Sequence, residues 1–163
     1  RTSPSPSSTS TEGIPSVGLS LVTQTNGNWR INITYEGRPC SKKSGQRIIM
    51  KQGRRMIIYS ENYSRLLKLV VPQLVELAEE RLGLGDTDLI GSSECPVHVK
   101  ALMYAGKGTE PDLSGALETV GDVLQAAVII ENDRWIKSWD GSRVLTDDKD
   151  NPRTEITLEP FYG

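Results

Sequence analysis

The sequence predicts an α/β or α+β domain in which helices pack on one mixed β-sheet. Three observations predict this class. One stretch alternates apolar and polar residues on both sides of a tight turn, and a second resembles two short strands around another turn, as β-hairpins do. Two longer stretches repeat apolar residues at helical spacing, and an alternating stretch follows each of them. The predicted order is hairpin, hairpin, helix, strand, helix, strand, strand, without an internal repeat.

The composition narrows the class of protein. The 163 residues suffice for one domain with a hydrophobic core. Residues 1–13 are rich in Ser, Thr and Pro, which predicts a disordered tail before a folded domain at 14–163. No apolar run is long enough to span a membrane and no signal peptide is visible. We therefore expect a cytoplasmic protein that is neither secreted nor bound to a membrane.

The cysteines and the single histidine argue against several kinds of site. Cys40 and Cys95 are far apart and lack metal-ligand spacing, which favours free, buried thiols in a reducing compartment. His98 lies in a predicted strand, where we expect it to be packed or half-exposed. One histidine is too few for most zinc sites, and no nucleophile elbow accompanies it for a Ser-His-Asp triad.

The first half of the chain predicts two hairpins and a long helix. Asn26-Gly27 suits the turn of the first hairpin, and Gln52-Gly53 the turn of the second, between "RIIMK" and "RMIIY". A helix of about two dozen residues is expected from an N-cap at Ser60 to a stop at Gly83. Pro72 should kink or break this helix near Lys68. Its core-facing positions are Leu67, Val70, Val71, Leu74, Val75, Ala78 and Leu82.

The second half predicts the remaining strands. "CPVHVKALMYAG" is a strand with Val97, Val99, Ala101 and Met103 on one face. "WIKSWDGSR" is expected to continue a strand into a turn at Asp140-Gly141. "RTEITLEPF" alternates Ile156 and Leu158 with polar residues and is expected to be the last strand.

Positive charge is concentrated between Gly37 and Ser60. This segment contains no acidic residue in a chain of net charge −2, and its seven basic residues are Arg38, Lys42, Lys43, Arg47, Lys51, Arg54 and Arg55. Such a loop and hairpin can follow a phosphate backbone. A solvated, lysine-rich loop is the alternative.

Acidic residues are concentrated between Pro111 and Trp135. Asp112 stands at an N-cap position before a helix whose apolar stripe is Leu113, Leu117, Val120 and Leu124. A second stripe, spaced four residues apart, contains Ser114, Glu118 and Asp122. Gly115 and Gly121 flank this stripe, which suggests that another segment approaches the helix closely.

The apolar run Val128 to Ile130 is expected to begin a strand that brings Asp133 near the acidic helix. Carboxylates in proximity repel unless a cation lies between them, and Mg²⁺ accepts two or three such ligands. Bound Mg²⁺ polarises a phosphodiester. Each acid also has an ordinary interpretation: Asp112 as a helix cap, Glu118 and Asp122 as a solvated face, and Asp133 as a turn residue.

The stretch from Asp112 to Asp133 resembles the metal-binding motif of the RusA family of Holliday-junction resolvases. Without a gap, Asp112 matches the first acid of the family's "DLDN", Asp122 the helix aspartate, and Asn132-Asp133 the acid pair. A weaker similarity extends from Ile31 to Phe161. The chain departs from the family pattern at four positions: Ser114 replaces the second acid, Gly115 the asparagine, Glu118 the lysine and Asn132 the first acid of the pair.

The resemblance implies a homodimer that binds four-way or branched DNA and resolves it by two symmetric cuts, with Mg²⁺ as cofactor and Mn²⁺ as a substitute. The implied catalytic residues are Asp112, Glu118, Asp122 and Asp133, with Asp112, Asp122 and Asp133 as metal ligands. The implied DNA-binding residues are Arg38, Lys42, Lys43, Arg47, Lys51, Arg54, Arg55 and Arg143. Positive charge near the acids is expected from Arg134, Lys137 or Arg143, since the family lysine is absent.

Three functions remain as hypotheses. The first is an active Mg²⁺-dependent endodeoxyribonuclease. The second is a junction-binding protein that has lost catalysis, which Ser114 and Glu118 favour. The third is an α/β interaction module with no nucleic-acid role, which leaves the charge segregation unexplained.

Overall fold

The computed structural model describes residues 14–23, 28–42, 47–58, 61–83, 90–108 and 110–162. The predicted tail, the Asn26-Gly27 turn, Lys43 and the Ser60 cap lie outside these residues. Within them, the structure confirms the predicted α+β class with one mixed sheet.

The main sheet has six strands. They are β1 (Val17–Thr23), β2 (Trp29–Glu36), β5 (Val97–Tyr104), β6 (Ile136–Ser138), β7 (Arg143–Leu145) and β8 (Arg153–Pro160). The order is β1-β2-β8-β5-β6, and β7 also pairs with β5. Neighbouring strands in the part β1-β2-β8-β5 pair antiparallel, whereas β6 and β7 run parallel to β5. The parallel pairing requires a crossover, which α3 (Leu113–Ala126) provides.

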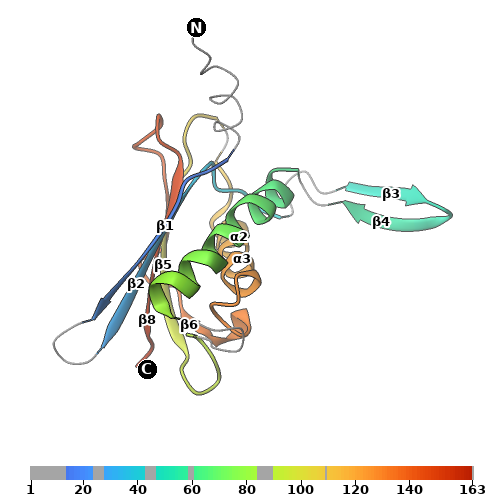
Figure 1. Ribbon diagram of the computed structural model, residues 1–163. Helices are drawn as coiled ribbons and strands as arrows, with labels where there is room; N and C mark the ends of the chain where they lie inside the picture. Colours follow the sequence, from blue (N-terminus) through green and yellow to red (C-terminus); the bar gives the residue numbers. More distant parts are fainter. Residues whose placement is uncertain are drawn as a thin grey trace, which may run out of the picture.

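Helices α2 (Glu61–Leu82) and α3 lie on the same face of the sheet (Figure 1). The predicted core positions of α2 are all buried or packed against the core. Pro72 lies inside an uninterrupted helix, so of the two expectations, a kink or a break, the break is wrong. Pro72 and Lys68 are both exposed, and water can therefore satisfy the Lys68 carbonyl that loses its donor. The helix ends as expected before Gly83, whose φ of +67° favours glycine.

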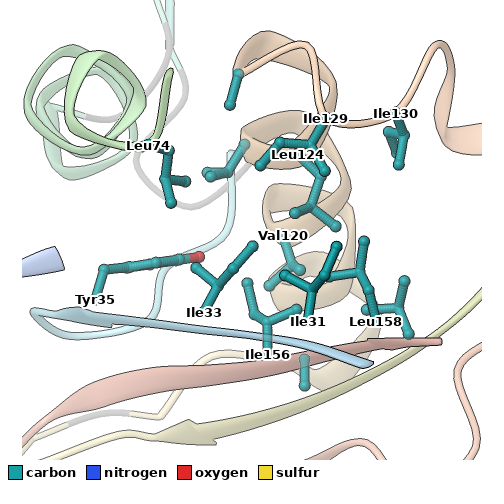
Figure 2. Close-up of a cluster of buried hydrophobic side chains, with 14 of the residues drawn as sticks. Ile31, Ile33, Tyr35, Leu74, Val120, Leu124, Ile129, Ile130, Ile156 and Leu158 are labelled. Carbon is teal, nitrogen blue, oxygen red and sulfur yellow. The ribbon is translucent and has the colours of Figure 1, made fainter. Parts of the chain in front are cut away.

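The hydrophobic core lies between the sheet and the two helices. In Figure 2, Ile31, Ile33 and Tyr35 of β2 and Ile156 and Leu158 of β8 point towards Leu74, Val120, Leu124, Ile129 and Ile130. The predicted strand face of β5 is fully buried. One stripe residue departs from expectation: Leu113 is 44% exposed, because it occupies the first turn of α3, at the end of the helix.

The strand expected at Val128 is absent from the described residues. Val128 has a φ of +59°, which no β-strand residue adopts, and the chain makes only one isolated bridge, between Gly91 and Ile130. A 3₁₀ helix, η1 (Asp133–Trp135), follows. The Asn132 side chain caps it by accepting a hydrogen bond from the Arg134 N–H at 3.0 Å. Strand β6 therefore begins only at Ile136, and β7 is a separate strand after the turn at Asp140-Gly141.

The second predicted hairpin forms but does not join the main sheet. Among the described residues, strands β3 (Arg47–Lys51) and β4 (Arg54–Ile58) pair only with each other. They extend away from the rest of the protein in Figure 1. We call residues 47–58 the arm.

The minor expectations have mixed outcomes. Both cysteines are free, but they are half-buried rather than buried. Desolvation raises the pKa of the Cys40 thiol to about 11, so it is protonated at neutral pH. His98 is half-buried, as expected. No helix in the described part of the chain has the length and apolar character needed to span a membrane.

Candidate functional site

The acidic helix begins at Asp112, as the sequence predicts. Asp112 has extended backbone geometry, and its Oδ2 accepts hydrogen bonds from the Gly115 N–H at 3.1 Å and from the Ser114 hydroxyl at 3.0 Å. The carboxylate therefore satisfies one of the unpaired donors of the first helical turn. The Ser114 hydroxyl supports Asp112 rather than the helix face that Glu118 and Asp122 share.

The close approach predicted at the helix glycines occurs at Gly115. Ser41, which is only 4% exposed, lies directly against it. A Cβ at Gly115 would lie 2.5 Å from the Ser41 Oγ and 2.9 Å from the Ser41 Cβ. Glycine at this position thus lets Ser41, in the basic segment between Gly37 and Ser60, pack onto helix α3.

Lys42 follows Ser41 and brings a positive charge to the helix acids. Its Nζ lies 3.4 Å from Glu118 Oε1 and 3.5 Å from Asp122 Oδ2. The Tyr63 hydroxyl of α2 donates a hydrogen bond of 2.8 Å to the same Asp122 oxygen. Partial burial lowers the pKa of Lys42, but the Asp122 and Glu118 carboxylates outweigh it and raise the pKa overall.

Asp133 reaches α3 from η1. Its Cβ lies 3.4 Å from the position that a Cβ on Gly121 would take, and its N–H donates to Gln125 Oε1 at 3.2 Å. The second helix glycine therefore faces Asp133, as a close approach predicts. Asp133 is exposed and flanks the turn of α3 that carries Asp122.

The acids do not all meet at one point. Asp112 caps the start of α3, whereas Asp133 lies beside Gly121, nine residues further along. At 1.5 Å per residue the two contacts are about 13 Å apart along the helix axis. The structure brings together Glu118 and Asp122, through Lys42, and places Asp133 of η1 beside Gly121, which precedes Asp122.

The chemistry of these side chains fits a hard divalent cation. They offer only carboxylate oxygens, which Mg²⁺ prefers. Glu118 and Asp122 already share one cation, the Lys42 ammonium. Over the described ranges, however, no three or more His, Cys, Asp or Glu side chains come together as a metal site.

The predicted DNA-binding residues that the structure describes lie in four places. Lys51, Arg54 and Arg55 are exposed on the arm, and Arg143 is exposed on β7. The Arg38 Nε donates to the Ala105 carbonyl at 3.2 Å, at the end of β5. Lys42 binds the acids. Strand β3 begins at Arg47, and Lys43 lies outside the described residues.

Arg134 and Lys137 lie close to Asp133 in the chain and stack on one aromatic ring. The Arg134 guanidinium carbon is 4.9 Å, and the Lys137 Nζ 5.3 Å, from the centroid of the Trp135 ring. The Trp135 indole N–H donates to Glu131 at 2.8 Å. This cluster places two positive charges in the chain segment that carries Asp133.

Two residues of the site were not predicted. Tyr63 bonds to Asp122 across 59 residues, and Ser41 packs on Gly115. No local spacing reveals either contact, because both depend on how α2 and the basic segment pack against α3. Only the absence of side chains at Gly115 and Gly121 signalled that another segment comes close.

Replacing Lys42 with methionine is expected to lower the free energy of unfolding by about 1–2 kcal/mol at neutral pH, since two carboxylates lose their shared cation. The Lys42 pKa is raised above its ordinary value of 10.5, so its contribution is complete below that pH and is lost as the pH rises through the folded-state value. Urea unfolding of both proteins at pH 7 and above pH 10.5 measures the difference.

Lys68→Met, at an exposed position of α2, is the matched control. A Lys42→Met variant that is no less stable than the Lys68→Met variant at pH 7 contradicts the prediction. So does a difference from wild type that remains unchanged at high pH.

No family model matches the sequence, and no curated protein matches it.

Proposed function

We propose that this protein is a Mg²⁺-dependent, structure-specific endodeoxyribonuclease that resolves Holliday junctions or other branched DNA by hydrolysing phosphodiesters. The observation that carries the proposal is the meeting of the basic segment with the acidic face of α3, where Lys42 contacts Glu118 and Asp122. This contact places the segment that leads into the basic arm beside carboxylates that suit a metal ion.

The residues have separate roles in this proposal. Asp122 and Asp133 would hold the metal, which when bound would polarise the scissile phosphodiester and lower the pKa of water. Asp112 caps the start of α3, about 13 Å away along the helix axis, so it would not share that ion. Tyr63 keeps Asp122 in position through its 2.8 Å hydrogen bond. Arg134 and Lys137, stacked on Trp135, place positive charge in the chain segment that carries Asp133. Lys51, Arg54, Arg55 and Arg143 bind DNA phosphates.

The proposal includes a homodimer acting in the cytoplasm of a prokaryotic or phage-infected cell. Two cuts placed symmetrically on a four-way junction require two active sites related by a twofold axis. The resemblance to the resolvase motif supports this assembly.

A second candidate is a protein that binds DNA junctions without cutting them. The specific observation in its favour is that three acids already have protein partners. Lys42 occupies the position between Glu118 and Asp122, and Asp112 caps α3 with the oxygen that also accepts from Ser114. A metal has to compete with these contacts.

Incubation with a synthetic four-way junction distinguishes the two. The proposal predicts paired, symmetric incisions in about 5 mM Mg²⁺ or Mn²⁺, and none in EDTA. A gel shift in EDTA measures binding separately. Binding without incision in either metal supports the second candidate. A folded protein that neither binds nor cuts contradicts both.

A further inference from the structure

The arm carries exposed apolar side chains as well as positive charge. Strand pairing sets Ile48 opposite Ile57 and Met50 opposite Arg55, so these four side chains share one face of the ribbon. On that face Ile48 and Met50 are each 66% exposed and Ile57 is 53% exposed. Such a concentration of exposed apolar surface on a short element marks an interaction site.

The arm has no support from the main sheet in the part of the chain that the structure describes. Strands β3 and β4 pair only with each other and extend from the body (Figure 1). A two-stranded hairpin by itself is at best marginally stable in water. An occupant that covers the apolar face therefore stabilises the arm when it binds.

Charge identifies the chemistry of the occupant. The arm contains four basic residues and no acidic one, while the chain as a whole has a net charge of −2. Three of the four, Lys51, Arg54 and Arg55, flank the turn at the tip and are exposed. A surface that combines cations with exposed apolar side chains fits a ligand with both phosphates and apolar faces, and a nucleic acid provides these in its backbone and its bases.

We infer that the arm enters a DNA groove at a branch point, where its tip cations bind phosphates and the face formed by Ile48, Met50 and Ile57 contacts unstacked bases. This inference rests on the proposed function and adds a second element to it, one that recognises the branch rather than cutting it. A two-stranded ribbon fits the major groove of DNA, which is about 12 Å wide. Apolar side chains of architectural proteins act as wedges between base steps, and bases at a branch are already partly unstacked.

The test compares affinities for a four-way junction and for a linear duplex over a range of salt concentrations. Substituting threonine at Ile48, Met50 and Ile57 keeps the strand propensity but removes the apolar face. We expect this variant to lose about tenfold of its preference for the junction, with an unchanged salt dependence. It should also fail to enhance the fluorescence of 2-aminopurine placed at the branch. Met56→Thr, on the opposite face of the ribbon, is the matched control.

Replacing Lys51, Arg54 and Arg55 with glutamine has a different expected signature. Affinity should fall for junction and duplex alike, and the slope of log K against log salt should decrease by about three. Circular dichroism confirms that each variant is folded.

Three results overturn the inference. If the apolar-face variant keeps the wild-type preference for the junction, the apolar face does not contact unstacked bases. If the apolar-face variant sediments largely as a monomer where the wild type is a dimer, and its remaining dimer keeps the junction preference, a second copy of the chain covers this face instead of DNA. If the wild-type protein binds no DNA, the proposed function is wrong as well. The first two results contradict the inference about the arm but not the proposed function.

Discussion

Replacing Asp133 with asparagine is expected to lower the rate of junction cleavage at least about 100-fold and to leave junction affinity within about twofold of wild type. Asparagine has almost the same shape but lacks the charge that a hard metal ion requires. Asp133 is exposed beside Gly121, so its substitution creates no buried, unsatisfied group. Single-turnover cleavage of a labelled junction gives the rate, and a gel shift in EDTA gives the affinity.

Asp133 is a cleaner probe than Asp122. Asp122 accepts the Tyr63 hydroxyl and pairs with Lys42, so its substitution also disturbs the packing of α2 and the basic segment on α3. Asp147→Asn, in an exposed loop, is the control for loss of one negative charge. Equal cleavage rates for wild type and Asp133→Asn remove Asp133 from the metal site.

Replacing Gly115 with alanine is expected to destabilise the protein by about 1–3 kcal/mol. The added methyl group would meet the Ser41 Oγ at 2.5 Å and the Ser41 Cβ at 2.9 Å, as well as the capping Asp112 Oδ1 at 2.9 Å. Ser41 is buried, so it has little room to move. The gain in helix propensity, about 1 kcal/mol or less, offsets only part of this cost.

Gly121→Ala in the same helix is the matched control. Its methyl group would meet the Asp133 Cβ at 3.4 Å, an ordinary contact, so we expect stability to be unchanged or to rise by up to about 1 kcal/mol. Urea unfolding of the two variants separates steric crowding from helix propensity. If Gly115→Ala and Gly121→Ala change stability equally, the contact between the basic segment and α3 does not constrain position 115.

Local signals predicted those parts of the fold that depend on neighbouring residues. The Asp112 cap, the Gly83 stop and the buried face of β5 follow from spacing within one element, and all are confirmed. The strand expected at Val128 is wrong because tertiary packing buries Ile129 and Ile130 in the core, and the chain turns through an unfavourable φ at Val128. Pro72 remains in a helix because its exposed position allows water to replace the lost hydrogen bond.

The two hairpins show where local signals run out. Both are predicted from short strand-like stretches around a turn, yet among the described residues β2 pairs with β8 in the main sheet whereas β3 and β4 pair only with each other. The difference is in the burial of their apolar residues: Ile31 and Ile33 are fully buried, and Ile48 and Met50 are exposed. The same limit applies to the site. The sequence indicated that acidic and basic residues are concentrated in separate segments. The pairing of Lys42 with Glu118 and Asp122, however, joins residues 76 and 80 positions apart in the chain.

The position of Asp122 has a consequence for the entropy of the arm. Lys42 precedes the arm in the chain and Tyr63 follows it, and both bind the same Asp122 oxygen. One carboxylate thus closes the intervening segment into a loop without a covalent cross-link, which restricts where the two ends of the arm can go. If the Asp122 carboxylate loses its two contacts, the loop opens. We therefore expect the orientational freedom of the arm to depend on whether Asp122 keeps Lys42 and Tyr63 as partners.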